Sequence, residues 1–304
     1  YCASSVCSPS RAGLLTGQFP GTNGIHDYLT PDHEVNAAKG TRDFLDPSVT
    51  TAPRLFQTAG YRTGHFGKWH LGHTEDAPSP FEYGYDMQKT TASIDHNWPD
   101  YAGDPKLRPL STKMITDETI AYIQECSAER KPFFINTWFQ DPHAILNPPE
   151  ELMEDYLGFT VAGIPYKSAT TIYYSVISDI DRNVGRILAT LDELGIADNT
   201  IVMFTSDNGP EDMEITNAAH SAAGSPGPFR GRKRSLYDGG IRMPFIVQWK
   251  GKVPAGTIDD SSVIGAVDML PTFCAIAGIE VPAEHCPEGE EVSDALYGDG
   301  HERE

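Results

Sequence analysis

Apolar residues recur every three to four positions over residues 171–194, which is the period of one face of a helix. Gly195 follows this segment as a stop signal. Helical spacing also appears at 112–126 and 263–277. The pattern therefore predicts helices over these three segments. In the first of them the apolar face consists of Ile172, Val176, Ile180, Val184, Ile187, Leu188 and Leu191.

Short apolar and β-branched runs predict buried strands at 131–140, 200–205 and 244–249. Alternation of these strands with helices predicts an α/β fold, with a mostly parallel sheet covered by helices on both faces. In such sheets ligands bind beyond the carboxyl ends of the strands. His143, Asp207 and Asn208 all follow predicted strands at that end.

The segment 77–104 is rich in Pro, Tyr, Asp and Gly, so we interpret it as a long loop, either a lid or a decoration. Its Asp95–Trp98 cluster and His220 are weak candidates for sugar contacts. We find no internal repeat, and no apolar run is long enough to predict a membrane-spanning helix.

The chain has 304 residues, which favours one large domain or two small ones. Its net charge of −20 argues against nonspecific nucleic-acid binding, although a local group of bases could still bind a small anion. Five cysteines without a C-x-x-C pair exclude a zinc ribbon and a dense disulfide framework. The cysteine pattern does not indicate whether the protein works in an oxidising or a reducing compartment.

The segment 7–11 reads Cys-Ser-Pro-Ser-Arg. Pro9 suits the first turn of a helix and Ser8 suits its cap, so we expect Cys7 at a helix N-terminus, where an anion is favoured. Arg11, one turn later, could hold an oxyanion in a bidentate grip. A structural Cys beside a surface Arg explains this segment equally well. A thiol phosphatase would instead space its Cys and Arg six residues apart.

This segment, followed by Leu15-Thr16-Gly17, resembles the signature of the type I sulfatases of the alkaline phosphatase superfamily. In that family a maturation enzyme oxidises the motif Cys to formylglycine (3-oxoalanine), and the aldehyde hydrate is the nucleophile. The resemblance implies that Cys7 is modified in this way and that the fold is alkaline-phosphatase-like.

Lys68-Trp69-His70, within a Gly-rich stretch, is similar to the second signature of the family. Lys68 and His70 are two residues apart, so on an extended stretch they face the same side. The resemblance implies that they bind the sulfate and its bridging oxygen. A Gly-rich turn with a solvated Lys and a packed His is the structural alternative, and we interpret His65 and His73 as structural or solvated.

Asp207 and Asn208 offer hard oxygen ligands that suit Ca²⁺ or Mg²⁺. An Asp-Asn-Gly triplet is more often a turn, but the resemblance implies a metal site formed by Asp207, Asn208 and modified Cys7. The family takes its other ligands from an Asp-Asp pair on a first strand. We expect that strand to precede Tyr1, so the metal site of this chain is incomplete.

The segment 230–242 contains five bases, although such runs are usually solvated faces. The resemblance singles out Lys233 as a sulfate-binding base, with Asp238 where the family more often has Glu. It also implies that His143 contacts the leaving oxygen. The five bases are Arg230, Arg232, Lys233, Arg234 and Arg242.

Hydrolysis of a sulfate ester requires an anion to be attacked by an oxygen nucleophile. Arg11, Lys68, Lys233 and a divalent metal would supply positive charge. Modified Cys7 would be the nucleophile. His143, with His70 or Lys233, would protonate the leaving alcohol.

The resemblance extends from Cys7 to Thr272 and is strongest to the arylsulfatase and N-acetylgalactosamine-6-sulfatase branch. It implies a sulfated sugar, glycan or aryl sulfate substrate, and a periplasmic, secreted or lysosomal location. We interpret 1–285 as a truncated catalytic domain and 286–304 as the start of the connection to an absent C-terminal subdomain. With its first strand also missing, we expect the isolated chain to be inactive.

Two alternatives remain. A phosphonate monoester or phosphodiester hydrolase of the same superfamily could use the same modified Cys and metal. A non-catalytic sulfoglycan-binding protein would result if Cys7 were never oxidised, but the intact Lys68, His70, His143 and Lys233 argue against it.

Overall fold

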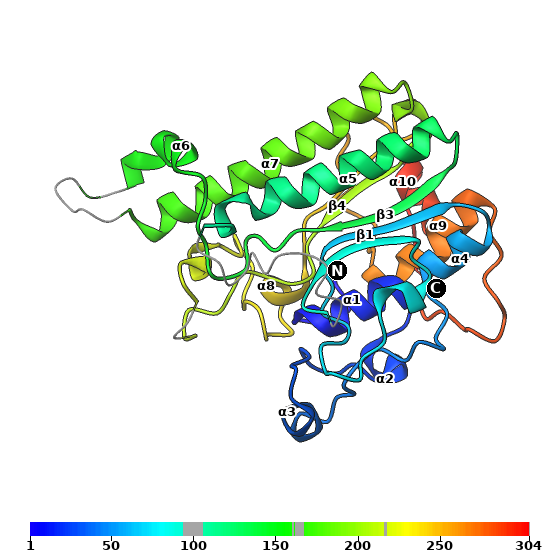
Figure 1. The fold of residues 1–304 in the computed structure, drawn as a ribbon, viewed down its shortest axis with the longest axis horizontal. Coiled ribbons are helices and arrows are strands. Elements are labelled where there is room, and N and C mark those ends of the chain that lie inside the picture. The colour runs from blue at the N-terminus through cyan, green and yellow to red at the C-terminus, as the bar shows by residue number, and fades with distance from the viewer. Residues whose placement is uncertain (94–105, 160, 162–166, 216–217, 304) are drawn as a thin grey trace.

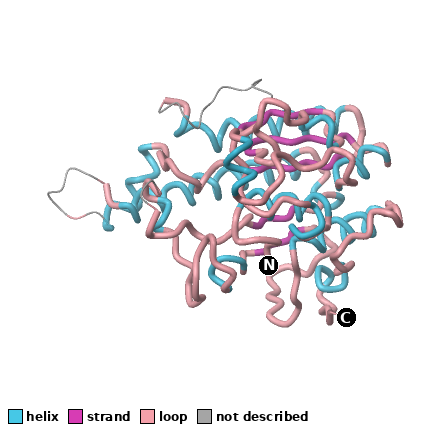
Figure 2. Tube along the Cα trace, turned by 90° about the horizontal axis from the view of Figure 1, so that it is seen from below, coloured by secondary structure: helices cyan, strands magenta, loops and turns pink. Residues whose placement is uncertain are grey.

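The computed structural model describes residues 1–93, 106–159, 161, 167–215 and 218–303. Three parallel strands form one sheet in the order β2-β1-β3, with β1 at Arg62–Lys68, β2 at Met87–Thr91 and β3 at Phe133–Trp138. Strand β4, Val202–Thr205, pairs with β5, Phe245–Gln248. Figure 2 shows these as two separate groups of strands.

Helices cover both faces of the β1–β3 sheet (Figure 1). On one face α5, Ser111–Ala128, packs on β1 and β3, and α7, Ala169–Glu193, packs on α5. On the other face α4, Ala52–Thr58, packs on the strands and contacts α1, Cys7–Thr16, and α9, Met269–Ala277. The predicted α/β architecture, with its parallel sheet and two helical layers, is confirmed.

The expected strands at 131–140, 200–205 and 244–249 and the helices at 112–126 and 171–194 all occur, with small shifts at their ends. Shorter helices and 3-10 turns connect them. These are α2 Pro20–Asn23, α3 His33–Ala38, α6 Glu150–Met153, α8 Asp238–Ile241, α10 Ser293–Tyr297, η1 Pro80–Tyr83, η2 Arg108–Leu110, η3 Glu154–Phe159, η4 Ala197–Asn199, η5 Ser221–Ala223 and η6 Ala266–Asp268.

Three expectations about local structure need correction. β4 and β5 are antiparallel, because β5 begins beside the end of β4: Thr205 is opposite Phe245. The expected loop at 77–104 contains η1 and the edge strand β2, whose polar sequence hides it. The part from 94 to 105, with the 95–98 cluster, lies outside the described residues.

The third correction concerns the helix expected at 263–277, which starts only at η6. The Asp268 carboxylate accepts a hydrogen bond from the Gly265 N–H at 2.6 Å, and the residues before Ala266 are not helical.

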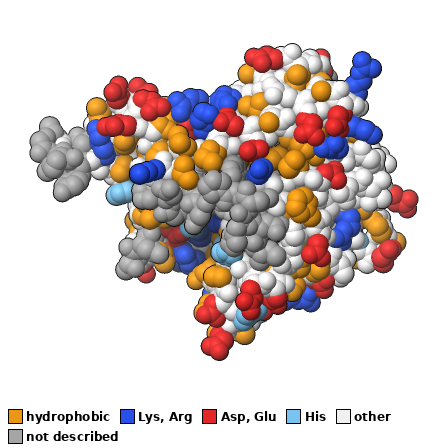
Figure 3. Space-filling view, in the orientation of Figure 1, with side chains coloured by type: hydrophobic (Ala, Val, Ile, Leu, Met, Phe, Trp, Pro, Cys, Tyr) orange, Lys and Arg blue, Asp and Glu red, His pale blue; other side chains and the backbone are white. Residues whose placement is uncertain are grey.

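The carboxyl ends of β1, β3 and β4 lead to residues 68–70, 141–143 and 206–209. Basic and acidic side chains are interspersed on the face drawn in Figure 3. Within the described parts of the chain, no helix is both long enough and apolar enough to cross a bilayer.

Candidate active site

Helix α1 begins at Cys7, so the thiol lies at a helix N-terminus as predicted, and Cys7 is only 3% exposed. The N-cap residue is Val6, which makes no side-chain cap bond. The prediction that Ser8 caps the helix is therefore wrong. Its hydroxyl instead accepts a hydrogen bond from the Leu29 N–H at 3.0 Å, which anchors a neighbouring loop to the helix.

The Arg11 side chain contacts three parts of the fold. Its Nε and Nη2 donate to Oδ2 of Asp207 at 2.9 and 2.6 Å, and its Nη1 donates to the Lys68 carbonyl at 2.9 Å. Its guanidinium also lies 4.8 Å from the centre of the Trp138 ring at the end of β3, a cation–π distance. Helix α1 is thus bound to the loop after β4 and to the ends of β1 and β3.

Lys68 is the last residue of β1 and is 5% exposed. Its ammonium makes no hydrogen bond or ion pair to any described residue. A buried cation without a counter-ion is unfavourable, and burial lowers the pKa of Lys68. Cys7 and Asp207 raise this pKa, whereas Arg11 and Lys233 lower it, so the five groups lie within electrostatic reach of one another.

His70 does not share an extended stretch with Lys68, contrary to expectation, because the strand has ended and His70 has a left-handed φ of 61°. Its Nε2 lies 2.9 Å from the Leu29 carbonyl, so Nε2 carries the proton in the neutral ring. Its Nδ1 is buried and has no partner among the described residues. Burial and the nearby Lys68 and Arg11 hold the pKa of His70 well below its ordinary value.

Lys233 is 6% exposed and lies 3.3 Å from Oε2 of Glu211. The other carboxylate oxygen of Glu211 pairs with Arg234. The sequence analysis missed Glu211, because the position of an acid after Asn208-Gly209-Pro210 does not indicate which base pairs with it. It also missed Trp138 as the ring beneath Arg11.

Close glycine packing brings the Asp207 loop against the Lys233 loop. The Gly209 N–H donates to the Gly240 carbonyl at 2.9 Å, and a Cβ on Gly209 would lie 2.1 Å from the Gly239 carbonyl oxygen. The Lys233 N–H donates to the Pro210 carbonyl at 3.0 Å. Side chains at these glycines would therefore separate Asp207 and Lys233.

His143 follows β3, and its Nδ1 lies 2.9 Å from the Ala144 carbonyl. Burial lowers the pKa of His143 to about 3, with Lys68 and Lys233 adding to the shift. Its ring is neutral at pH 7, so in this tautomer Nε2 has no proton to donate.

Asp207 remains ionised in this group. Burial alone would raise its pKa, but Arg11, Lys68 and Lys233 outweigh burial and hold the pKa well below its ordinary value. The structure thus brings together all eight residues predicted for the site: Cys7, Arg11, Lys68, His70, His143, Asp207, Asn208 and Lys233.

Comparison with known proteins identifies the family. A model described as Sulfatase matches residues 1–279. The N-acetylgalactosamine-6-sulfatase of Mus musculus is 31% identical over 315 residues, which cover 95% of this chain and 56% of that protein. The arylsulfatase of Hemicentrotus pulcherrimus is 26% identical over 326 residues, which cover 97% of this chain and 54% of that protein. The chain belongs to the sulfatase family.

The crystal structure of Ps i-CgsB in complex with k-i-k-neocarrahexaose has the same fold. It matches with a TM-score of 0.81 at 24% identity, covering 99% of this chain and 68% of that one. Against the curated sulfatase sequences, this chain spans somewhat more than half of their length.

The sulfatase family implies a divalent metal, and Asp207 and Asn208 offer chemistry that fits one. Oδ1 of Asn208 is buried without a partner, and Asp207 uses only Oδ2 for Arg11, both judged against the described residues. Two such oxygens are hard ligands, but Ca²⁺ takes six to eight. Across the described part of the chain, no cluster of three or more His, Cys, Asp or Glu side chains could hold a metal.

Proposed function

We propose that this chain forms the catalytic part of a formylglycine-dependent sulfatase that hydrolyses sulfate esters on sulfated sugars. The observation that carries the proposal is the buried Lys68 ammonium, which has no counter-ion among the described residues and lies within electrostatic reach of Cys7. Arg11, Lys68 and Lys233 are three buried cations, whereas Asp207 and Glu211 supply two carboxylates. An anionic ligand would complete this arrangement.

The three cations bind the sulfate oxygens. A sulfate ester repels an incoming oxygen nucleophile, so fixed positive charge around the sulfur lowers the barrier to attack. Two of the cations are already held in place before substrate arrives, Arg11 by Asp207 and the Lys68 carbonyl and Lys233 by Glu211. Little reorganisation is then needed during the reaction.

Cys7 is the position of the nucleophile. When present, formylglycine supplies an oxygen nucleophile as its hydrate. The N-terminus of α1 favours negative charge at this position, and Arg11, one turn along the helix, directs its charge to the same side. An unmodified thiol lacks the hydroxyl groups of the hydrate.

The leaving alcohol needs a proton, and Lys233 or His143 would donate it. His143 is neutral in the free protein, so it can act as the acid only when a bound anion raises its pKa. Nδ1 of His70 lacks a partner among the described residues and can accept a hydrogen bond from a protonated group.

Asp207 and Asn208, with the Cys7 position, would hold Ca²⁺, or Mg²⁺ as the alternative. The metal would add positive charge at the sulfate oxygens. Oδ2 of Asp207 accepts both hydrogen bonds from Arg11, and Oδ1 accepts none from the described residues, so Oδ1 is available to a metal.

The relatives support a sulfated sugar as the substrate class, since the mouse relative is an N-acetylgalactosamine-6-sulfatase. A small aryl sulfate would test the same chemistry without the sugar. A formylglycine-generating enzyme is the required maturation partner, and a periplasmic, secreted or lysosomal location is part of the proposal.

Turnover of matched esters tests the proposal. The complete gene product is produced with a formylglycine-generating enzyme and assayed on 4-nitrophenyl sulfate, an N-acetylgalactosamine 6-sulfate and a phenylphosphonate monoester. We expect sulfate release that depends on Cys7 and falls by at least about 10⁴-fold in Cys7→Ser. Preference for the phosphonate ester would favour the rival hydrolase. Sugar binding without turnover by matured protein would favour the sulfoglycan-binding protein.

A further inference from the structure

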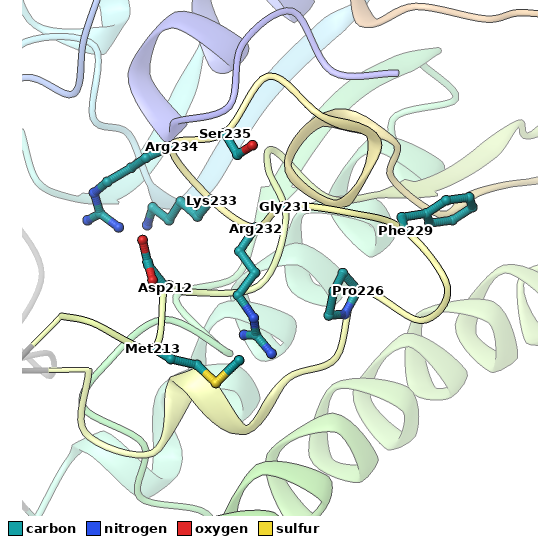
Figure 4. Close-up of a pocket in the computed structure, with 9 residues that line it drawn as sticks. All are labelled: Asp212, Met213, Pro226, Phe229, Gly231, Arg232, Lys233, Arg234 and Ser235. Atoms are coloured by element: carbon teal, nitrogen blue, oxygen red, sulfur yellow. The ribbon is translucent and has the colours of Figure 1, made fainter.

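A cavity of about 430 Å³ opens beside Lys233 (Figure 4). Its volume falls within the roughly 300–1,000 Å³ usual for small-molecule sites. Lys233 forms part of its wall and also belongs to the candidate active site, so the cavity adjoins the place where the sulfate would bind. The lining residues are Asp212, Met213, Pro226, Phe229, Gly231, Arg232, Lys233, Arg234 and Ser235.

Arg232 brings an uncompensated positive charge to this wall. Its Nη1 donates to the carbonyls of Glu211 and Ala222 at 2.8 and 3.2 Å, and its Nη2 donates to the Gly224 carbonyl at 2.8 Å. All three acceptors are neutral, and no described carboxylate forms an ion pair with Arg232. The guanidinium is therefore held rigidly while its charge stays available.

Lys233 and Arg234 share a single carboxylate, Glu211. Asp212 is the acid among the lining residues, whereas the Glu211 carboxylate contacts the wall through Lys233 and Arg234. Three cations thus face two carboxylates, so the cavity has a local surplus of positive charge in a chain of net charge −20. In Figure 4, Lys233 and Arg234 point toward Asp212, whereas Arg232 points toward the side of Met213.

The backbone of Arg234 is left-handed, with φ at 73°, and its N–H donates to the Ser5 carbonyl at 3.0 Å. For a residue with a Cβ this conformation is unfavourable. Such strain is typical of functional positions. This backbone conformation places the Arg234 side chain beside Lys233. Apart from the pair with Glu211, the N–H donors of its guanidinium make no bond to described residues.

We propose that this cavity binds the sugar unit of the substrate and that Arg234 binds a second anionic group on that glycan, with Arg232 adding positive charge to the same wall. A uronic acid carboxylate and a second sulfate ester share the oxygen geometry that a guanidinium fork recognises. Met213 and Pro226 offer apolar contacts to the ring. This inference rests on the proposed function, because the first sulfate is taken to lie at Lys233.

Calorimetric binding tests the inference without turnover, using the complete gene product with Cys7→Ser. The probes are N-acetylgalactosamine 6-sulfate, its 4,6-disulfate and a chondroitin 6-sulfate disaccharide that carries a uronate. We expect at least one of the two dianionic probes to bind roughly fivefold or more tightly than the monosulfate, the size of one charge-assisted hydrogen bond. Which one does so distinguishes sulfate from carboxylate.

Two variants should change the ratio of dianionic-probe affinity to monosulfate affinity in opposite directions. Arg234→Asn removes the charge while keeping a residue that tolerates a left-handed backbone, so the affinity ratio should fall toward one. Asp212→Asn removes a repelling carboxylate, so the ratio should rise. Arg242→Gln is the matched control, since Arg242 is paired with Asp238 at 3.8 Å, does not line the cavity and should leave the ratio unchanged.

Equal binding of all three probes, or a ratio that Arg234→Asn and Asp212→Asn leave unchanged, would overturn the inference. Absence of sugar binding while the matured enzyme still hydrolyses 4-nitrophenyl sulfate would overturn the inference alone. Absence of both would overturn the proposed function as well.

Discussion

Two buried ionic networks lie close to each other in this molecule, and they are built differently. Arg108 donates to the Asp141 carboxylate, to the His143 carbonyl at 3.0 Å, to the Ser111 hydroxyl at 2.6 Å and to the Ile145 carbonyl at 2.8 Å. The second oxygen of Asp141 accepts from the Thr112 hydroxyl at 2.7 Å. In this network every charge is paired.

The network around Lys68 is open instead. Its ammonium forms no ion pair with a described residue. Among the same residues, the buried Nδ1 of His70 and Oδ1 of Asn208 have no hydrogen-bond partner. Lys68 is 5% exposed and Arg108 is 3% exposed, so the burial of these two cations does not distinguish the networks. We infer from this difference that the closed network holds the His143 loop in place. The open network would be completed by an anion and a cation that bind from outside.

The largest effect should follow from removing the unpaired charge. Lys68→Met keeps the side-chain volume but loses the cation, so kcat for an aryl sulfate should fall roughly 10²- to 10³-fold. The free energy of unfolding should stay within about 0.5 kcal/mol or increase, because no ion pair is broken. A stability loss comparable to that of a broken buried ion pair would mean that the Lys68 network is closed too.

The same change in the closed network should act on stability. Arg108→Met leaves Asp141 buried without its partner, so the free energy of unfolding should fall by about 3–5 kcal/mol. Arg186→Met is the matched control, since Arg186 pairs with Asp117 near the surface and should lose only about 0–1 kcal/mol. Equal losses in urea unfolding of the two variants would remove the contrast between the networks.

A smaller effect is expected at Trp138, whose ring centre lies 4.8 Å from the Arg11 guanidinium. Trp138→Leu removes the ring, so kcat/KM should fall roughly threefold to thirtyfold, the range of a partly desolvated cation–π contact. Trp138→Phe should recover most of the loss. Trp249→Leu serves as the control, because Trp249 packs on Tyr297 instead. If phenylalanine rescues no better than leucine, the ring does not position Arg11.

The smallest effect concerns a third, partly exposed network, where His301 bridges Glu290 and Asp294 at 3.0 and 2.9 Å. Hydrogen bonds to Glu290 and Asp294 raise the pKa of His301 above its ordinary value. Its stabilisation is therefore complete below about pH 6.5 and is lost as the pH rises through the raised pKa. Unfolding midpoints of wild type and His301→Gln should differ most at pH 5–6 and converge at high pH. A difference independent of pH would contradict this.

Much of this arrangement could be predicted from residues near each other in the sequence. Cys7 and Arg11 share one helix, and the strands before His143 and Asp207 set the edge at which they meet. The partners of charges could not be predicted, because they depend on contacts between distant segments. Glu211, which pairs with Lys233 and Arg234, is one example.

Capping and strand ends were also hard to predict. Ser8 is a good N-cap residue by type, but the N-cap is Val6, two residues earlier, and the Ser8 hydroxyl accepts a hydrogen bond from the Leu29 N–H instead. The end of β1 at Lys68 changes the geometry of His70, which spacing alone could not reveal. Strand β2 escaped notice because its buried residues, Gln88 and Thr90, are polar and satisfy each other at 2.7 Å.

The central claim is that Cys7 carries the nucleophile of the open network. The most direct test is the mass of the peptide containing Cys7, from protein made in its native host and treated with an alkylating reagent. The account predicts a peptide that is not alkylated and is about 18 Da lighter than the thiol form, because oxygen replaces sulfur and two hydrogens. A fully alkylated thiol at Cys7 would contradict the claim.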